Sequence, residues 1–346
     1  MPIEASCSNR SQVLTEKLKE LGTKDPQVMV FRIDAHNLLK QHAESIPNIT
    51  MHLGNGLVSV DTVNASIKLS SGEERSGDLV VGADGIHSLT LQSVDASAAQ
   101  TSRMGLNMYR FLIPASKAKQ NTEVSAMLDK LGFFDGVGNN IINPSTKTSL
   151  IVYPCRGCDI VNCLTFQAEG DEKTKLPEDD YNCPGTAEDV QHLLHKWPQN
   201  FQALAGMAED VTHWAAATRD VPSTYIKDRL VLVGDAAHPT MPKHGAGAGM
   251  GMEDAATLAT LLDGNVTKED LPRRLELYNQ LRYPRTVTTK FASEIFKLGW
   301  TTNPDEAAQE LLTQKVPGAL VPKDAQAYLF KYDVVQEAKS ALADAA

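Results

Sequence analysis

The sequence predicts an α/β protein whose parallel-sheet strands lie near both ends of the chain, with a mainly β segment inserted between them. Two short apolar runs, Leu79–Val81 and Leu230–Val233, have the continuous pattern of strands buried on both faces of a parallel sheet. The second run leads into a glycine-rich loop and a helix. Residues 104–166 instead contain runs of strand-forming residues around tight turns, which favours mixed or antiparallel sheet. We expect the two apolar runs to belong to one sheet.

Composition limits the class of protein. The 346 residues are enough for two packed lobes or one large domain. The formal net charge is −10, and no run rich in Lys or Arg is present, which disfavours nucleic acid and an anionic membrane surface as partners. No stretch approaches the length and apolarity of a membrane span. The chain starts without an apolar signal core, so we expect a cytoplasmic protein; its oligomeric state is left open.

The first third of the chain reads as two helices followed by a small antiparallel unit. Helices are predicted over residues 11–22 and 34–45, with Asp34 as the cap of the second. Short alternating runs between residues 51 and 71 predict the antiparallel unit.

The later elements are predicted from turn residues and helical spacing. Residues 171–186 read as an exposed loop and residues 187–197 as a helix. In the helix after the glycine-rich loop, small apolar residues recur at i, i+3, i+4 and i+7 and are expected to pack on a sheet: Met252, Ala255, Ala256 and Ala259.

The C-terminal part is predicted to be helical. A long helix begins at Asp270 and is expected to kink at Pro284, and residues 324–346 form a helical tail.

The most informative stretch is GDAAHPTMPKHGAGAGMGMEDAATLATLL, residues 234–262. Asp235 follows a predicted strand, and open α/β sheets bind ligands beyond the carboxyl ends of their strands. Its carboxylate could accept hydrogen bonds from hydroxyl groups. Glycines allow a flat ligand to approach the backbone, and the helix start favours an anion or an electron-rich carbonyl. The stretch therefore predicts a planar ligand with hydroxyls and an acceptor edge. The alternative is a glycine-rich turn that only closes a structural helix.

This order of residues, GDAAHP followed by PxxGAGAGxGxEDA, resembles the flavin-contacting motif of the FAD-dependent aromatic-ring monooxygenases. That single-component group includes the p-hydroxybenzoate and salicylate hydroxylases. The resemblance implies that Asp235 holds the ribityl chain of FAD. It also implies a set of residues that line the flavin ring: Pro242, Gly245, Ala246, Gly247 and Ala248.

Two further segments resemble motifs of the same family. DLVVGADGIHS, residues 78–88, is similar to its DG motif, which implies that Asp84 and Gly85 lie near the cofactor pyrophosphate and the nicotinamide path. The segment from Phe31 to Asp34 is similar to an element whose arginine contacts FAD, here Arg32.

The resemblance implies a FAD/NAD(P)-binding Rossmann-like domain with an inserted mixed β-sheet substrate domain and C-terminal helices. The corresponding ranges are 1–98 and 216–270 for the FAD-binding domain, 99–215 for the substrate domain and 271–346 for the helices.

Two features depart from the family pattern. The G-x-G-x-x-G fingerprint of the first βαβ unit is not found, so we expect the Rossmann-like domain to be N-terminally incomplete. Related sequences often carry His and then Gln just after the loop proline, where this chain has Lys243 and His244. Either residue could act as a catalytic base or anion anchor, or both could be solvated loop residues.

The family resemblance implies a FAD-dependent monooxygenase that hydroxylates a phenolic or salicylate-like aromatic molecule. NAD(P)H would reduce the flavin, O2 would form a flavin C4a-hydroperoxide, and the substrate would lie between residues 100–215 and the flavin loop. The alternative is a FAD-poor derivative, either a pseudoenzyme or a non-redox binding or isomerase-type protein. A truncated, non-functional fragment is the third possibility.

The remaining motifs predict no metal site. Cys155 and Cys158 form a C-x-x-C pair, but the five cysteines of the chain do not supply a second pair at zinc spacing. We therefore read them as ordinary turn cysteines with reduced thiols. His192 and His195 lie on one predicted helix face without an acidic partner in the H-E-x-x-H arrangement, which favours a solvated helix surface.

Overall fold

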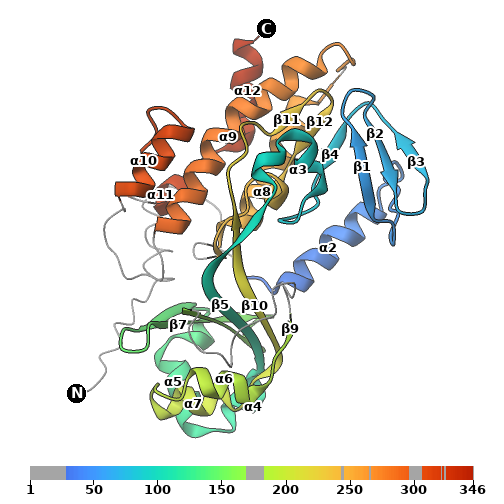
Figure 1. Ribbon diagram of the computed structural model, residues 1–346. Helices are drawn as coiled ribbons and strands as arrows, with labels where there is room; N and C mark the ends of the chain where they lie inside the picture. Colours follow the sequence, from blue (N-terminus) through green and yellow to red (C-terminus); the bar gives the residue numbers. More distant parts are fainter. Residues whose placement is uncertain are drawn as a thin grey trace. The chain divides into compact units, whose positions relative to one another are not determined.

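The computed structural model describes residues 29–168, 183–242, 245–264, 266–295, 306–320, 322 and 325–345. The chain divides into two compact units (Figure 1). Unit 1 contains the described parts of residues 1–51 and 103–216. Unit 2 contains those of residues 52–102, 217–297 and 301–346.

Unit 1 is built on one six-stranded sheet with the order β6-β7-β8-β5-β10-β9. Strand β8 pairs with β5 on one side and β7 on the other, and both pairings are antiparallel, as are those of β6 with β7 and β9 with β10. The mixed or antiparallel sheet predicted for residues 104–166 is confirmed in these antiparallel pairings. The strands are β5 (Thr101–Pro114), β6 (Asn139–Asn143), β7 (Thr148–Cys155), β8 (Ile160–Ala168), β9 (Cys183–Pro184) and β10 (Glu209–Arg219).

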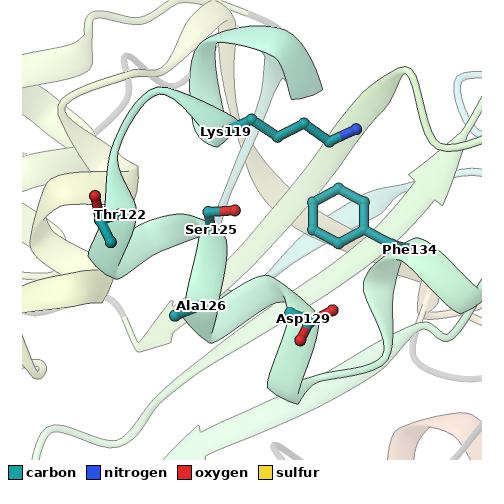
Figure 2. Close-up of a pocket in the computed structure, with 6 residues that line it drawn as sticks. All are labelled: Lys119, Thr122, Ser125, Ala126, Asp129 and Phe134. Carbon is teal, nitrogen blue, oxygen red and sulfur yellow. The ribbon is translucent and has the colours of Figure 1, made fainter.

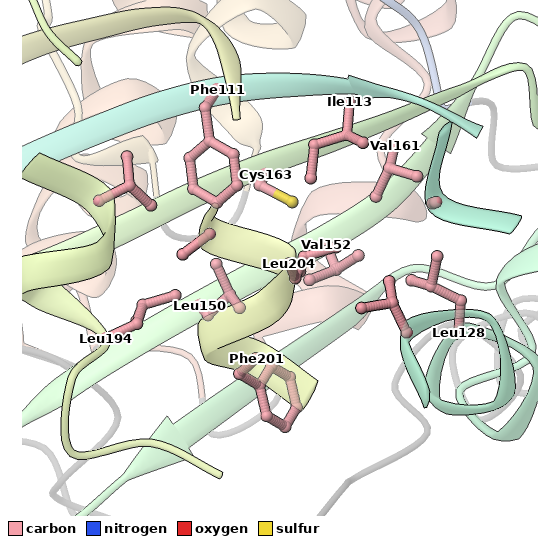
Figure 3. Close-up of a cluster of buried hydrophobic side chains, with 14 of the residues drawn as sticks. Phe111, Ile113, Leu128, Leu150, Val152, Val161, Cys163, Leu194, Phe201 and Leu204 are labelled. Atoms are coloured by element: carbon pink, nitrogen blue, oxygen red, sulfur yellow. The ribbon is translucent and has the colours of Figure 1, made fainter. Parts of the chain in front are cut away.

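Short helices cover one face of this sheet. Side chains alternate between the two faces of a strand, so Phe111 and the residue opposite it, Cys163, point to the same face, as does Val152 opposite Cys163. Figure 3 shows this buried apolar cluster, in which Phe111, Leu150 and Cys163 are fully buried. The covering elements are α4 (Ala115–Lys119), α5 (Thr122–Lys130), η2 (Phe133–Asp135), α6 (Ala187–Leu193) and α7 (Gln199–Ala205).

The predicted helix at residues 34–45 is present as α2 (Arg32–Glu44), but the prediction of Asp34 as its cap is wrong. Phe31 is the N-cap and provides no side-chain cap. Asp34 lies in the first turn, where its two carboxylate oxygens accept hydrogen bonds from Arg156 at 2.8 and 2.7 Å. Arg156 lies in the turn between β7 and β8, so the carboxylate binds a distant segment and not its own helix start.

Unit 2 contains two small sheets. Strands β1 (Leu57–Asp61), β2 (Ser66–Leu69) and β3 (Glu74–Ser76) form the antiparallel unit predicted from the alternating runs. In the second sheet, β12 (Leu230–Leu232) pairs antiparallel with β11 (Ile226–Lys227) and parallel with β4 (Val80–Gly82). The two apolar runs therefore belong to one parallel pair, as predicted.

The expected burial of both runs holds only for β12. All residues of β12 are buried, whereas Val81 of β4 is 48% exposed. Among the described strands, β4 has a neighbour on one side only. An edge strand with one open side leaves part of its side chains uncovered, which an apolar run by itself does not reveal.

The helices of unit 2 pack around the second sheet. Tyr225, Leu232, Leu258 and Tyr278 are among its buried core residues. The helix α9 continues through Pro284, and the C-terminal tail forms two helices instead of one. The helical elements are α3 (Leu89–Val94), η1 (Ala96–Ala98), η4 (Gly234–Ala236), α8 (Ala246–Leu261), α9 (Leu271–Ile295), α10 (Glu306–Lys315), α11 (Ala325–Phe330) and α12 (Val334–Asp344).

The packing face predicted for the helix after the glycine-rich loop is wrong. Met252 is 56% exposed, and Ala255 and Ala259 are also exposed. The buried side of α8 instead contains an acidic residue, in the set Ala246, Met250, Asp254, Thr257, Leu258 and Leu261. The prediction assumed that only apolar residues face the interior, whereas a buried charge is accepted when it is paired.

Two predictions lie wholly or largely outside the described residues. The helix predicted over residues 11–22 is among them, as is most of the loop predicted over residues 171–186. None of the described helices is long and apolar enough to cross a membrane.

Candidate functional site

The candidate site in unit 2 is formed by the loops that follow β4 and β12. Because these strands are parallel, both loops leave the sheet at the same edge. Arg219 joins them from the end of β10: one guanidinium nitrogen donates to the Ile86 carbonyl at 2.9 Å, and another donates to the carbonyls of Asp235 and Ala236 at 2.9 and 2.6 Å. Arg219 is only 2% exposed, so its charge is used inside the protein to hold the two loops together.

Asp84, in the first loop, is fully engaged in holding the start of α3. Its Oδ1 accepts hydrogen bonds from the hydroxyls of Ser88 and Thr90, both at 2.6 Å, and its Oδ2 accepts from the backbone N–H groups of Leu89 and Thr90. Burial raises the pKa of this carboxyl, but these hydrogen bonds outweigh burial and lower it. Any contact of this loop with a ligand would therefore come from its backbone, next to Gly85, more readily than from the Asp84 carboxylate.

The second loop is fixed by a buried carboxylate on α8. Asp254 is 0% exposed, and its Oδ2 accepts hydrogen bonds from the Gly234 N–H at 2.8 Å and from His238 Nε2 at 2.7 Å. Burial raises the pKa of Asp254, but the charges of His238 and Arg282 and their hydrogen bonds lower it overall, so the group is ionised. Lys290 of α9 adds a hydrogen bond to the Pro239 carbonyl at 3.3 Å.

These internal contacts leave the functional groups of the loop exposed. The Asp235 side chain is exposed, and no described residue forms a hydrogen bond with its carboxylate. Gly245 begins α8 in the left-handed region, with φ of 64°, and gives the helix no side-chain cap. A Cβ built on Gly245 or Gly249 would meet no atom within 4 Å. The open glycine surface and the uncapped helix start therefore suit a flat ligand with an electron-rich edge.

Polar atoms around this loop add to the fit. Three of them are buried and have no hydrogen-bond partner among the residues that the structure describes: Arg219 Nε, His238 Nδ1 and Thr240 Oγ1. A Cβ on Gly247 would come within 3.0 Å of the Thr240 hydroxyl. Together with the Asp235 carboxylate, these donors and acceptors suit a ligand that carries several hydroxyls and a polar ring edge.

The residues predicted from the sequence are only partly brought together. Gly85 and Asp235 lie in the two joined loops, and Pro242 and Ala248 are exposed beside the glycines, whereas Ala246 is buried at the start of α8. Lys243 and His244 lie outside the described residues.

Arg32 is exposed at the start of α2 and belongs to unit 1. Its role remains a prediction.

No sequence motif predicted a role for the buried charges that shape the loop, namely Arg219, Asp254, Arg282 and Lys290. The available signal was their positions, because Asp254 lies on the helix face that carries Met250, Leu258 and Leu261. A charged residue at an apolar position predicts a buried partner, although the spacing does not say which one.

Unit 1 also has polar side chains on one face of its sheet, opposite the face that α4, α5, α6 and α7 cover. Arg110 alternates with Phe111, and Asn162 alternates with Val161, so both point away from the apolar cluster. Arg110 Nε and Asn162 Oδ1 are buried, and no described part of the chain forms a hydrogen bond with either atom. On the same face, burial raises the pKa of Tyr153 to about 12, so its hydroxyl stays protonated and available as a donor.

Two other features of unit 1, a surface hollow and a pair of cysteines, contain none of the predicted site residues. Figure 2 shows a shallow hollow lined by α4, α5 and the start of η2, in which the Lys119 ammonium lies 4.8 Å from the Phe134 ring centroid. No predicted site residue lines it. Cys155 and Cys158 are free thiols, and Cys158 is hydrogen-bonded to the Phe133 carbonyl at 3.4 Å. Among the described residues, no three His, Cys, Asp or Glu side chains cluster as metal ligands would.

Comparison with protein families gives a match to an FAD binding domain over residues 7–290. Hispidin-3-hydroxylase of Neonothopanus nambi is 30% identical over 269 residues, which are 75% of this chain and 63% of that protein. The 3-amino-4-hydroxybenzoate 2-monooxygenase of Streptomyces cremeus is 30% identical over 75% of this chain and 59% of its own length. The chain thus spans about three fifths of the length of these two relatives.

Solved structures show the same fold. A salicylate hydroxylase in complex with its substrate matches 90% of this chain and 75% of its own, with a TM-score of 0.68 and 23% identity. Klebsiella pneumoniae HpxO, complexed with FAD and uric acid, matches 95% of this chain and 75% of its own, with a TM-score of 0.65 and 17% identity.

Proposed function

Because the chain belongs to the family of proteins with this FAD binding domain, we propose that it is a FAD-dependent monooxygenase that hydroxylates a small aromatic molecule. NAD(P)H and O2 are the co-substrates. The observation that carries the proposal is the loop after β12: buried groups occupy its backbone, while the Asp235 carboxylate and the glycine surface stay exposed. The names of the relatives support the same class of reaction.

The donors and acceptors of unit 2 suggest two of the cofactor contacts, and the family resemblance supplies the others. Asp235 would bind hydroxyls of the ribityl chain, and the start of α8 would stabilise negative charge on the flavin ring through its dipole and free N–H groups. When bound, FAD supplies the redox chemistry and the activation of O2. The proposed contacts with the ring and the pyrophosphate are Arg32, Asp84, Gly85, Pro242, Gly245, Ala246, Gly247 and Ala248.

We assign substrate binding to residues 99–215, with residues 1–98 and 216–270 as the FAD-binding domain and 271–346 as C-terminal helices. The sheet face of unit 1 that carries Arg110, Tyr153 and Asn162 has a cation and neutral donors, which would orient a phenolic or salicylate-like substrate. Lys243 and His244 remain candidates for a base or an anion anchor. The free described cysteines fit a reducing compartment, and we expect the protein to work in the cytoplasm.

The test is direct. The purified full chain is titrated with FAD, the visible absorption and flavin fluorescence are recorded, and NADPH oxidation and product formation are then measured with a panel of phenols and aromatic carboxylates. We expect a bound-flavin spectrum and oxidation of NADPH that is stimulated by an aromatic substrate and coupled to its hydroxylation.

The matched pair of variants is Asp235→Ala and Asp129→Ala, both at exposed aspartates. Asp235→Ala should weaken FAD binding by about tenfold or more, since a charge-assisted hydrogen bond contributes ~1.5–3 kcal/mol. Asp129→Ala should not change it. A folded chain that stays colourless at saturating FAD would refute the proposal and favour a non-redox binding protein.

A further inference from the structure

The loop after β12 is connected to the C-terminal segment by a continuous network of charged side chains, of which Asp254, Arg282 and Arg285 are buried and Glu253 is partly exposed. Glu253 and Asp254 are adjacent on α8, and Arg282 and Arg285 lie one turn apart on α9. Arg282 Nε donates to Asp254 Oδ1 at 2.7 Å, and its Nη1 donates to Glu253 Oε2 at 2.7 Å. Arg285 donates to both oxygens of Glu253, at 2.6 and 2.7 Å. The two arginines therefore share Glu253.

At its outer end, the network reaches α11. Arg285 also donates to the backbone carbonyls of Tyr328 and Leu329, at 3.0 and 3.1 Å. Its guanidinium lies 3.9 Å from the Tyr332 ring centroid and 5.2 Å from that of Tyr328. Cation–π contacts of this kind are favourable, particularly when the cation is shielded from water, and Arg285 is only 4% exposed.

At its inner end, the network reaches the backbone of the candidate cofactor loop. Asp254 uses one oxygen for Arg282 and the other for the Gly234 N–H and His238. Gly234 has φ of 58°, a conformation that favours glycine, and its carbonyl accepts hydrogen bonds from the N–H groups of Ala237 and His238. The position of the Asp254 carboxylate thus sets the turn that presents the Asp235 side chain.

We propose that Arg285 and Tyr332 are positioning residues that hold the loop of residues 234–239 from the C-terminal segment, through Glu253, Arg282 and Asp254. The proposed series of contacts begins at α11 and Tyr332 and ends at Gly234. In between it passes through Arg285, Glu253, Arg282 and Asp254. The proposed effect on the conformation of the loop depends only on contacts within unit 2. Its consequence for FAD rests on the proposed function.

The directionality of these contacts explains why charged residues occupy the four positions. Buried ion pairs add little net stability compared with well-packed apolar residues, because both charges lose their hydration. They do restrict geometry, since each carboxylate oxygen here accepts from a specific donor. Asp254 could not keep Gly234 and Arg282 as partners if α9 shifted along α8, so the network fixes the register of the two helices relative to the loop.

The first test is hydrogen exchange on the full-length protein without FAD. The peptide that covers residues 230–242 is followed in wild type, Arg285→Ala, Arg285→Lys and Tyr332→Leu. We expect Arg285→Ala to speed its exchange by about tenfold or more, because the loop would open more often. Arg285→Lys should recover part of the protection, and Tyr332→Leu should have a smaller effect in the same direction. Peptides from residues 57–76, in the same unit, should exchange as in wild type.

The matched control is Arg273→Ala, which removes an exposed arginine from the same helix. It should not change exchange anywhere in residues 230–242. If Arg285→Ala does not fold, Tyr332→Leu still tests the proposal because it leaves every ion pair of the network intact. Folded variants at both positions with unchanged exchange over residues 230–242 would overturn the proposal.

The second test concerns the cofactor. For the same variants, the Kd for FAD and the absorption maxima of the bound flavin are measured. We expect Arg285→Ala to raise the Kd by about tenfold and to shift the flavin spectrum, with partial rescue in Arg285→Lys. If wild type does not bind FAD, the proposed function fails, while the exchange experiment still decides the positioning role. Accelerated exchange together with an unchanged Kd and spectrum would refute the link between the network and the cofactor.

Discussion

The buried centres of the two units differ in composition, because unit 2 has ion pairs beside its apolar core. The core of unit 1 is an apolar cluster between a sheet and four short helices, with Phe111, Leu128 and Leu150 fully buried (Figure 3). The centre of unit 2 contains Asp254 and Arg282, both 0% exposed, next to a loop that carries the candidate site. Burial in unit 1 provides stability by removing apolar surface from water. Burial in unit 2 also defines the path of a polypeptide loop, which non-directional apolar contacts do poorly.

This difference predicts different consequences of mutation. Damage to the core of unit 1 should lower stability and leave the loop of residues 234–239 unchanged. Damage to the ion network of unit 2 should lower stability and change the loop together.

The largest effect is expected for Arg282→Met. This change leaves Asp254 buried with one partner fewer, and removing one member of a buried ion pair costs about 3–5 kcal/mol. Denaturant unfolding, followed by circular dichroism, measures the loss. The double variant with Asp254→Leu should regain part of the stability but not the protection of the Gly234 amide. Full recovery of both would show that the charges are dispensable for the loop.

A comparable or slightly smaller effect is expected for Leu150→Ala in unit 1. Leu150 is fully buried in the apolar cluster, and such truncations cost about 2–5 kcal/mol, depending on how far the cavity collapses. The same unfolding experiment measures the loss. Hydrogen exchange of residues 230–242 should match that of wild type once the protein is folded, and a change there would contradict the contrast between the two units.

A smaller effect is expected for Gly82→Ala, at the end of β4. The added Cβ would lie 2.2 Å from the Thr90 hydroxyl oxygen and 2.7 Å from the Thr90 Cβ, so α3 or the strand must move. Overpacking of this kind costs about 1–3 kcal/mol. The second substitution Thr90→Ser removes a methyl group but keeps the hydroxyl that Asp84 binds. It should recover little of the lost stability, because the clashing oxygen remains. Thr90→Ala should recover more of the packing and lose that hydrogen bond.

The smallest effect is a pH dependence in unit 1. His213 stacks on Tyr109 with 4.0 Å between ring centroids, and burial lowers its pKa. The unfolded chain therefore binds a proton near pH 6.5, while the folded chain does so only at lower pH. The contribution of His213 to folding stability is complete above about pH 6.5, and it declines as the pH falls below that value. The urea midpoint of wild type, relative to His213→Gln, should decrease between pH 7.5 and 5.5; a constant difference would contradict the assignment.

The sequence alone predicted most of the described elements and the general location of the candidate site. Continuous apolar runs predicted β4 and β12 as members of one parallel sheet. Alternating runs predicted the antiparallel unit of β1, β2 and β3, and strand-forming runs around tight turns predicted the sheet of unit 1. Local chemistry was sufficient because strand periodicity and glycine conformations are encoded by neighbouring residues. The glycine-rich stretch predicted both a helix start and a ligand surface, and Gly245 begins α8 in the left-handed conformation.

The sequence could not identify partners that are distant along the chain. Asp34 was expected to cap its own helix but binds Arg156, which lies 122 residues away. The small residues of α8 were expected to face the sheet, but Asp254 takes the buried side because Arg282, 28 residues further on, neutralises it. Val81 was expected to be buried and is half-exposed because β4 has a single neighbour among the described strands.

By itself, the sequence therefore determined which functional groups are present and which family the chain resembles. These groups are a carboxylate after a strand and glycines at a helix start, and the family consists of flavin-binding proteins. Only the tertiary structure decided how these groups are held. Asp235 is presented outward because Arg219, Asp254 and Lys290 bind the backbone and side chains around it from other elements. The physical reason is that hydrophobic periodicity is a local property, whereas the pairing of buried charges depends on which segments the fold brings within hydrogen-bond distance.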